Sequence, residues 1–309
     1  MIKRTIEISS KPAHLTVKRR QLVLKRGIET IVSFPCEDVG VVLVDHPGAT
    51  YSHAALSSLV DSDATLVVCG RDHLPCGILL PLSDHSQIVW RLHEQISASK
   101  PLRKQLWKQL VQAKIRGQAF NIPGDYPAHR KLLDMACHVR SGDPQNIEAQ
   151  AARVYWSNYL PDEVFRRDRN ADGLNSLLNY GYAVIRAAVA RALVAAGLMP
   201  AIGLHHSNRS NSFCLADDMM EPLRSLVDDR ARELFRAGCD NLDKEAKAGL
   251  LKLLSDRVSF GDEHGPLMVN LHRMTASLVR CYQGLAKTLE IPKAISPTAS
   301  DSLASDPVP

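Results

Sequence analysis

Hydrophobic and polar residues alternate in short runs over roughly the first 80 residues of the chain. A period of two is typical of strands that bury one face, and turn residues separate the runs. One short helix fits between them, at Ser52–Val60. The predicted strands are Thr5–Ile8, His14–Val17, Gln21–Leu24, Thr30–Ser33, Val39–Val44, Thr65–Cys69 and Gly77–Leu80. The pattern therefore predicts a β-rich N-terminal region.

The pattern changes after Pro81–Ser86, a segment rich in turn and polar residues that we interpret as a hinge. Beyond it, apolar residues recur at the spacing of amphipathic helices. Pro101–Gly117 also begins with Pro and ends at Gly, as helices commonly do. The predicted helices are Gln87–Ala98, Pro101–Gly117, Ala128–Val139, Asn146–Tyr159, Asn175–Ala196, Leu215–Ala237, Lys244–Val258 and Leu267–Thr288.

These elements predict an α+β protein with two domains, for which a chain of 309 residues is long enough. We expect residues 1–84 to form a small β-rich domain and residues 85–290 a larger all-α domain. Residues 291–309 are rich in Ser and Pro and poor in apolar residues. We expect this last segment to be a disordered tail.

Charge adds a candidate nucleic-acid surface. The net charge of +5 is only mildly basic, but nine Lys or Arg stand against two Asp between Lys100 and Arg140. Basic clusters of this kind suit a polyanion. A solvated helix face explains the same pattern equally well, and composition does not separate the two interpretations.

Several features favour a cytoplasmic protein that has no membrane partner. The seven cysteines are scattered, without a CxxC or a Cys/His zinc pattern, as in proteins of a reducing compartment. The N-terminus lacks the apolar core of a signal peptide. The richest apolar segment, around Tyr182 to Met199, is interrupted by Arg186 and Arg191.

Candidate chemistry begins with an acidic cluster at the start of the predicted helix Leu215–Ala237. Asp218 and Glu221 are three residues apart and share one helix face, and Asp217 adds a third carboxylate. Acids in a first helical turn are common because they interact favourably with the helix dipole. Three so close together repel one another unless a cation compensates them, which favours a metal site.

An imidazole and a further acid complete the candidate site. The sequence Gly203-Leu-His-His206 lies on the connection that leads into the acidic helix. Glu148 lies near the start of a helix with small side chains, although spacing alone does not select it over Glu163. Two carboxylates with one imidazole suit Mg²⁺ or Mn²⁺. The chain has no GxxxxGK[ST] loop for ATP and no GxSxG motif.

Three ordered motifs then resemble the family of CRISPR-associated endonucleases and integrases, the catalytic subunits that insert new spacers into CRISPR arrays. They are Asn175-Ser-Leu-Leu-Asn-Tyr-Gly-Tyr182, Gly203-Leu-His-His206 and Ser212-Phe-Cys-Leu-Ala-Asp-Asp-Met-Met-Glu-Pro-Leu-Arg224. The resemblance covers nearly the whole chain except its C-terminal tail. The Asp-x-x-Glu-Pro sequence is similar to the branch from type II systems.

The resemblance implies a ligand set and a mechanism. The family's metal ligands fall on Glu148, His206 and Glu221, and Asp218 would support the site or contact a second ion. Asp217 and His205 are extra neighbours, which leaves open which of each adjacent pair turns inward. Spacer DNA would be inserted by attack of its 3′-hydroxyl on a phosphodiester at the repeat boundary.

The family resemblance also implies partners: prespacer and leader–repeat DNA, a second copy of the chain joined through the β domain, and the second, small CRISPR-associated adaptation protein, together forming a heterohexamer. Candidate phosphate contacts are Lys104, Lys108, Arg166, Arg167 and Arg169. For Asn179 and Tyr182 we favour local hydrogen bonding over DNA contact. Two other functions fit the same residues: a general nuclease for branched or single-stranded DNA, and a non-catalytic DNA-bridging scaffold.

Overall fold

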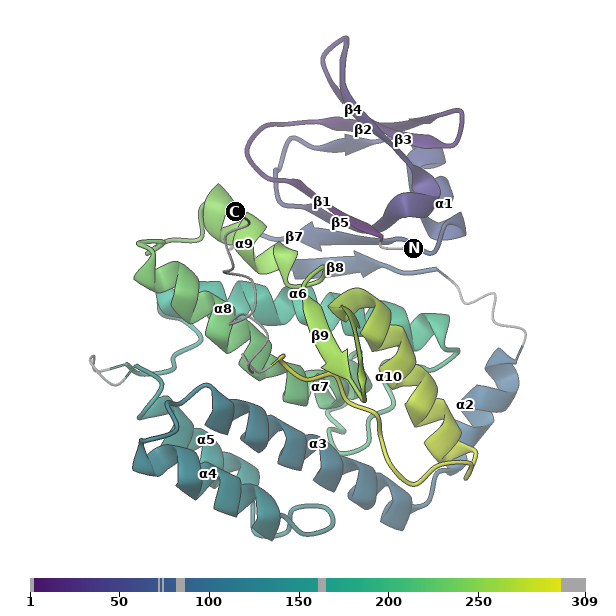
Figure 1. Cartoon of the computed structure of the whole chain (residues 1–309). Coiled ribbons are helices and arrows are strands. Elements are labelled where there is room, and N and C mark those ends of the chain that lie inside the picture. Colours follow the sequence, from purple (N-terminus) through teal and green to yellow (C-terminus); the bar gives the residue numbers. More distant parts are fainter. Residues whose placement is uncertain (1–2, 72, 74, 82–86, 161–164, 296–309) are drawn as a thin grey trace, which may run out of the picture.

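The computed structural model describes residues 3–71, 73, 75–81, 87–160 and 165–295. A strand-rich N-terminal part is stacked on a larger helical part, which confirms the expected α+β class and the order of the two regions (Figure 1). Of the predicted hinge, residues 82–86 lie outside the described residues.

The strand-rich part contains two four-stranded sheets. In the first, the order is β1 (Arg4–Ile8), β5 (Val39–Val44), β7 (Thr65–Cys69) and β8 (Pro75–Leu79). β1, β5 and β7 run parallel, and β8 is antiparallel to β7. The second sheet has the order β4 (Glu29–Pro35), β3 (Gln21–Arg26), β2 (His14–Lys18) and β6 (Thr50–Tyr51).

The first sheet separates two hydrophobic cores. Every residue of β5 is buried, because both faces of this strand are covered. Val42 and Val44 belong to the core of the N-terminal part, together with residues of α1 (His53–Asp61). Val41 and Leu43 point the other way and join the core of the helical part. Because successive side chains of β5 point to opposite faces, this one strand contributes to the cores of both regions.

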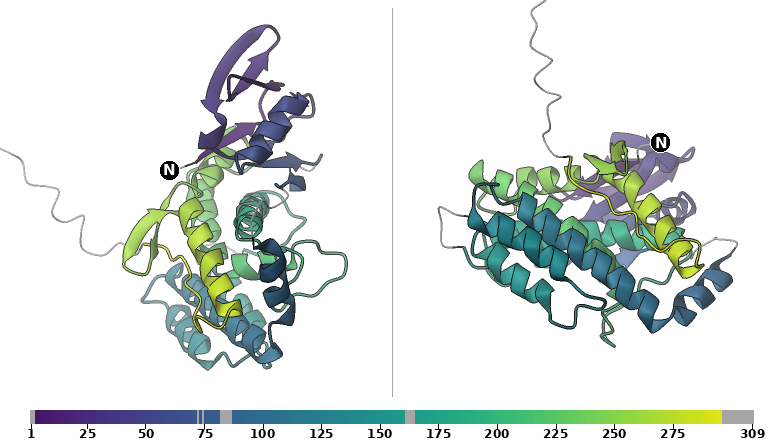
Figure 2. Two further views of the ribbon diagram at one scale, coloured as in Figure 1. Left: turned by 90° about the vertical axis from the view of Figure 1, so that its right-hand side faces the viewer. Right: turned by 60° about the horizontal axis from the view of Figure 1, so that its bottom comes forward.

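The helical part surrounds one long buried helix, α6 (Leu174–Ala195), which contacts β7 and β8 of the first sheet. The other helices are α2 (Ile88–Ser97), α3 (Lys100–Phe120), α4 (Pro127–His138), α5 (Ile147–Trp156), α7 (Cys214–Met220), α8 (Arg224–Arg236), α9 (Lys244–Lys252) and α10 (Leu267–Tyr282). Figure 2 shows the blue-to-teal helices α3, α4 and α5 at the end of the molecule away from the sheets. α6 has the length and hydropathy of a membrane span, but 78% of its apolar window is buried inside the protein, as in a core helix.

Several predicted boundaries are wrong, among them the end of the helix expected at Leu267–Thr288, which lies at Tyr282. The single helix expected at Leu215–Ala237 is divided by a 3₁₀ turn, Glu221–Leu223, where Pro222 supplies no amide N–H for a continuous helix. The helix expected at Lys244–Val258 ends at Lys252, and an antiparallel hairpin follows, formed by β9 (Arg257–Phe260) and β10 (Glu263–Pro266). The helical part is therefore not entirely α.

Another difference concerns the C-terminal tail. Residues 291–295 of the segment expected to be disordered are described in the structure, and residues 296–309 lie outside it. Lys293 exchanges two backbone hydrogen bonds with Ser259 of β9 (2.9 and 3.0 Å). The hairpin thus gives the chain after α10 a strand edge to pair with, which the sequence pattern did not indicate.

Two ion pairs, which we call the interface pairs, join the strand-rich and helical parts. Arg191 of α6 binds Asp63, which follows α1, with 2.6 Å between Nη2 and Oδ2. Lys247 of α9 binds Asp45 at the end of β5. The side chains of Arg191, Lys247 and Asp45 are almost entirely buried. These pairs fix the position of the sheets on α6 and α9.

Candidate metal site in the helical part

In the loop between α6 and α7, the backbone at Gly203 lies very close to the backbone of His206 and to Asp218. A Cβ on Gly203 would lie 2.3 Å from the backbone oxygen of His206 and 2.8 Å from Oδ2 of Asp218. Both distances are shorter than real Cβ contacts, so a residue with a side chain would push the loop away from α7. The glycine three residues before His206 is therefore a steric requirement.

Asp218 of α7 is completely buried and organises this loop. Its carboxylate accepts hydrogen bonds from the backbone N–H groups of Leu204 (2.6 Å), His205 (3.0 Å) and His206 (3.2 Å). It also binds Nδ1 of the His206 ring at 2.6 Å. This last hydrogen bond raises the pKa of His206 and fixes the orientation of its ring.

Trp107 of α3 supports both histidines through ring contacts. The His205 ring stacks on the Trp107 ring, with centroids 4.3 Å apart and planes 2° from parallel. The His206 ring meets the edge of the same indole, with centroids 5.6 Å apart. Because Trp107 is buried, its position is fixed by the packing of α3, and it holds the two imidazoles in different orientations.

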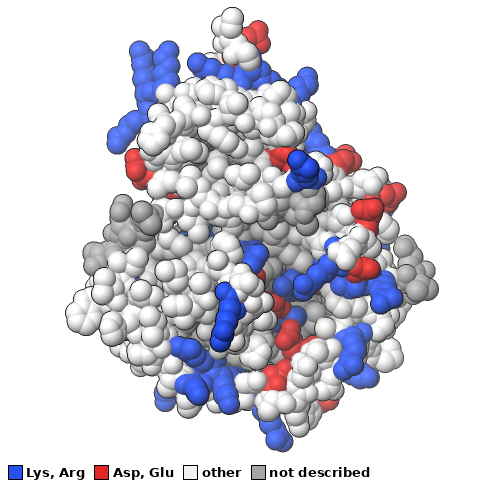
Figure 3. All heavy atoms as spheres, turned by 180° about the vertical axis from the view of Figure 1, so that it is seen from behind, with Lys and Arg blue, Asp and Glu red and all other residues white. Residues whose placement is uncertain are grey.

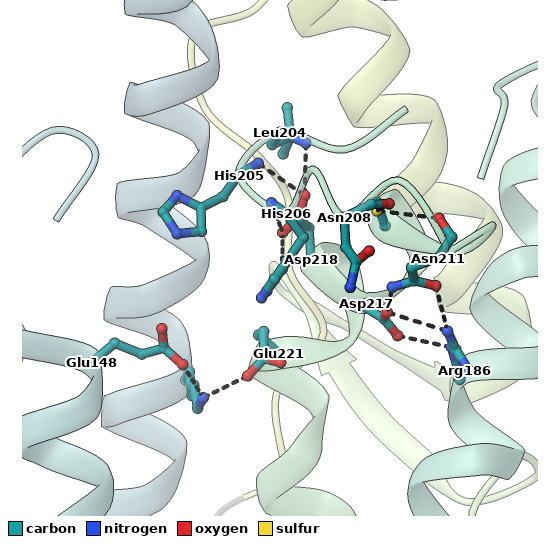
Figure 4. A network of polar contacts seen from close by, with 12 residues as sticks. Glu148, Arg186, Leu204, His205, His206, Asn208, Asn211, Asp217, Asp218 and Glu221 are labelled. Carbon is teal, nitrogen blue, oxygen red and sulfur yellow. Dashed lines mark hydrogen bonds and ion pairs between the residues drawn. The ribbon is translucent and has the colours of Figure 1, made fainter. Parts of the chain in front are cut away.

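Glu148 enters the site from α5, whose start is defined by two polar side chains. Asn146 caps the helix by accepting from the N–H of Ala149, and Asp143 accepts from the N–H of Glu148 (2.9 Å). The Glu148 side chain is 26% exposed and reaches toward Glu221 on the 3₁₀ turn (Figure 4). The start of α5 and the 3₁₀ turn thus bring the carboxylates of Glu148 and Glu221 toward one another.

Lys114 of α3 lies between these two carboxylates. Its Nζ is 2.5 Å from Oε1 of Glu148 and 2.5 Å from Oε2 of Glu221. Arg224 binds the second oxygen of Glu221 at 2.9 Å. Burial of Glu221 opposes ionisation, but Arg224 and Lys114 outweigh it and lower the pKa of Glu221 to about 2. Both acids of the pair are therefore held near a shared positive charge.

The structure separates the adjacent residues that the sequence left open. Asp217 faces Arg186 (2.8 Å) and Asn211 (2.6 Å), whereas Asp218 faces His206. His205 stacks away over Trp107, and Figure 4 shows the His206 ring directed from the loop toward Glu221. Of the two histidines, His206 therefore turns toward Glu221, and of the two aspartates, Asp218 binds His206. We call Glu148, His206, Asp218, Glu221, Lys114 and Arg224 the site cluster.

The donors of the site cluster fit a hard divalent ion. Glu148 and Glu221 converge on one positive charge, and the His206 ring nitrogen that is not bound to Asp218 points to the same side (Figure 4). Asp218 fits less well as a ligand, because its two oxygens already accept four hydrogen bonds. Among the described residues, no three His, Cys, Asp or Glu side chains stand close enough together to hold an ion as they are.

The candidate DNA contacts are placed apart from one another. Lys104 and the less exposed Lys108 lie on α3, and Arg166 and Arg169 are exposed before α6. Arg167 differs, because its guanidinium donates to Oδ1 of Asn175 (2.9 Å) and of Asn179 (2.5 Å). Arg167 thus has local partners, and its contact with phosphate stays a prediction.

Tyr182, too, is used locally: its hydroxyl donates to Asp228, in agreement with the local hydrogen bonding that we favoured. Figure 3 shows Lys and Arg side chains around a hollow of the back face in which acidic side chains lie. This charge pattern is the one expected where a polyanion approaches an acidic metal site.

Sequence reasoning did not identify Lys114, Trp107 or Arg224 as members of the site. Lys114 was counted only as one of nine basic residues, although it is 7% exposed and cannot belong to a solvated surface. A signal was present, because Lys114 lies next to the apolar residues Leu110, Val111 and Ile115 on the buried face of the helix. A lysine at such a position needs buried acids as partners.

Comparisons with known proteins identify a family and agree with the fold. The family model for the CRISPR associated protein Cas1 matches residues 6–252. The CRISPR-associated endonuclease Cas1 of Neisseria meningitidis is 37% identical over 91% of this chain and 93% of its own length. A CRISPR-associated endonuclease Cas1 of Pyrobaculum aerophilum is 28% identical over 89% of this chain and 98% of its own.

Solved structures show the same fold at low sequence identity. A casposase bound to integration product has a TM-score of 0.76 and 18% identity, and covers 94% of this chain and 92% of its own. A chain of a Cas6-RT-Cas1–Cas2 complex has a TM-score of 0.75 and 16% identity, and covers 93% of this chain and 35% of its own. A Cas1 protein from Thermotoga maritima has a TM-score of 0.69 and 18% identity, with 91% and 97% covered. The chain belongs to the Cas1 family of CRISPR-associated proteins.

Proposed function

We propose that this chain is the catalytic subunit of a spacer-integration complex and that it joins DNA strands at a single divalent ion. One observation carries the proposal: the carboxylates of Glu148 and Glu221, from two different helices, converge on one positive charge beside the buried His206–Asp218 pair. The structural relatives include a casposase bound to integration product and a Cas1–Cas2 complex, which supports the same class of activity.

In this proposal Glu148, His206 and Glu221 hold Mg²⁺ or Mn²⁺. Asp218 accepts from Nδ1 of His206 and so leaves Nε2 as the ligand atom, which makes Asp218 a positioning residue. His206 cannot then act as a free general base. When bound, the ion would polarise the scissile phosphodiester and stabilise charge on the departing 3′-oxygen.

The reaction is a transesterification. A spacer 3′-hydroxyl attacks a phosphodiester at the repeat boundary, one P–O bond forms, and the bond to the repeat strand's 3′-oxygen breaks. Because one phosphodiester replaces another, no ATP is consumed, which agrees with the lack of a GxxxxGK[ST] loop in the sequence. Lys104, Lys108, Arg166 and Arg169 would contact DNA phosphates.

We further propose that the chain works as a homodimer joined through residues 1–84, with Cas2 as the small partner in a heterohexamer. The presence of Cas2 in the complex formed by a structural relative supports this partner, and the family membership supports DNA as the substrate. Location in the cytoplasm remains a prediction.

His206→Ala and His205→Ala provide the test. Each variant is incubated with the partner protein, a prespacer duplex, a leader–repeat plasmid and Mn²⁺ or Mg²⁺. We expect His206→Ala to abolish strand joining and His205→Ala to retain it, because only His206 is held by Asp218 and faces the acids. If His205→Ala is inactive while His206→Ala integrates, the ligand assignment is wrong. If neither substitution matters, the metal-site proposal fails.

The same reaction distinguishes the competing functions by product. Joined strands indicate transesterification, and hydrolysed ends without joined product indicate a general nuclease. Full spacer acquisition by cells that carry Glu221→Ala would instead support a non-catalytic bridging scaffold.

A further inference from the structure

Lys114 occupies the point between the two carboxylates where the proposed ion would bind. We infer that Lys114 is the resident cation of the metal-free site and that a divalent ion loads the site only by displacing its ammonium group. This inference rests on the proposed metal site, and it assigns Lys114 the role of setting the ion affinity.

The geometry makes the two cations alternatives. Nζ of Lys114 lies 2.5 Å from an oxygen of Glu148 and 2.5 Å from an oxygen of Glu221. A Mg²⁺ ion binds oxygen ligands at about 2.0–2.1 Å, so an ion shared by these carboxylates would lie almost where Nζ lies. Two positive charges cannot share that point. The ammonium must therefore leave before both carboxylates can bind an ion.

Arg224, the other basic side chain of the site cluster, does not lie between Glu148 and Glu221. It binds the opposite oxygen of Glu221, at 2.9 Å, and its guanidinium lies over the Tyr182 ring, 4.5 Å from the centroid. Arg224 can therefore keep its contacts while the side of Glu221 that faces Glu148 changes partner. Among the described basic residues, only Lys114 is seen to bridge the two acids.

The burial of the acids gives the arrangement a physical reason. The Glu221 side chain is 6% exposed, and an ionised carboxylate this deeply buried needs a compensating charge. Lys114 supplies that charge before the ion arrives, and the ion supplies it afterwards. The two acids thus remain compensated in both states of the site.

The displaced ammonium has an acceptor within the same helix. Oε1 of Gln118 is buried and has no hydrogen-bond partner among the described residues. Gln118 lies four residues after Lys114 on α3, so the two side chains lie on the same helix face. A rotation of the flexible lysine stem toward Gln118 would move the charge away from the ion without exposing the core.

The inference predicts a tighter, not a weaker, metal site when Lys114 loses its charge. If Lys114 holds the site closed in about 90% of molecules or more, the apparent Mn²⁺ affinity is reduced about tenfold or more. Lys114→Met removes this competition. It also leaves two carboxylates without a cation between them, which attracts the ion further. Both effects strengthen the binding of Mn²⁺.

The test measures Mn²⁺ binding to the full chain after removal of metals with a chelator, by electron paramagnetic resonance of the free ion. We expect Lys114→Met to lower the Kd for Mn²⁺ about tenfold or more. Arg116→Met is the matched control, because it removes an exposed positive charge from the same helix and should leave the Kd unchanged. Lys114→Gln should tighten binding as Lys114→Met does, and it decides the question if the methionine variant does not fold.

Two different failures can be distinguished with Glu148→Gln. If wild type binds Mn²⁺, Glu148→Gln loses this binding, and neither Lys114 variant binds more tightly than wild type, the role of Lys114 is refuted while the metal site stands. If Glu148→Gln binds Mn²⁺ as well as wild type does, the proposed metal site itself is wrong.

Discussion

The site cluster and the interface pairs both bury charge, but they do so in different ways. At the interface pairs each acid meets at least one basic side chain: Asp63 meets Arg191 and Lys3, and Asp45 meets Lys247 and the His73 ring. The site cluster contains three acids but only two basic side chains besides the imidazole. The interface pairs thus have no excess of acid, and the site cluster has one.

The exposure of the side chains can be compared in the same way. The Asp45 and Lys247 side chains are almost entirely buried, although the exposed His73 ring also reaches Asp45, and Asp63 of the other pair is 42% exposed. In the site cluster, His206 and Glu148 are partly exposed, with side chains 44% and 26% accessible. A pair without excess acid serves the fold, whereas a partly open cluster with excess acid remains able to bind a cation. Buried charge therefore indicates a site only when it is both unbalanced and accessible.

The largest expected effect comes from the site cluster. Glu221→Gln removes the charge of a proposed ligand but keeps its shape, and we expect strand joining to fall at least about 10³-fold. The assay is joined product on a denaturing gel. Glu263→Gln removes an exposed carboxylate of the β9–β10 hairpin and serves as control. Near-normal joining by Glu221→Gln would show that the excess acid has no catalytic use.

The interface pairs should behave in the opposite way. Lys247→Met leaves Asp45 buried without its ammonium partner, and we expect the free energy of unfolding to fall by about 3 kcal/mol. Urea unfolding measures this loss, and the strand joining of the folded protein should be retained. Exposed Lys244→Met, on the same helix, should change stability by less than about 0.5 kcal/mol. Lost activity without lost stability would contradict a purely structural role.

Asp218→Asn tests the residue that belongs to the site cluster without being a proposed ligand. An amide cannot accept all four hydrogen bonds, so the loop and the His206 ring lose their fixed orientation. We expect strand joining and Mn²⁺ affinity to fall about 10–100-fold. Asp217→Asn, which acts on the Arg186 contact instead, should cost less. A larger loss from Asp217→Asn would reverse our assignment of the two acids.

The smallest expected effect is a pH dependence of stability. Burial alone would raise the pKa of Glu221, but Arg224 and Lys114 lower it to about 2, from an ordinary value of 4.5. Because the folded pKa is depressed, the ionised form contributes stability above about pH 4.5, and this contribution is lost as the pH falls toward 2. The stability difference between wild type and Glu221→Gln should therefore shrink over this range. Unfolding curves at several pH values check this, and a difference independent of pH would contradict it.

Much of the fold could be predicted from the sequence, because periodicity is a local property. The apolar run Val39–Val44 identified a strand with the correct bounds, and Thr65–Cys69 was equally well predicted. The errors arose where long-range contacts decide. The hairpin β9–β10 is stabilised partly by Lys293, which pairs with β9 from 34 residues away. α7 ends at Met220, two residues before Pro222. Pro222 was a local signal for this end, but the apolar pattern continues past it and predicted one long helix.

The sequence by itself determined which residue types were available for the site: the glycine that the His206 loop requires, the two adjacent histidines, and the acids at 148, 217, 218 and 221. Only the tertiary structure decided which member of each adjacent pair turns toward the others. It also placed Lys114 and Trp107, about 100 residues before the loop, beside the acids and the imidazoles. The physical reason is that spacing along the chain fixes a side chain's direction only within one element, and the packing of α3 against α7 and the 3₁₀ turn brings the elements together.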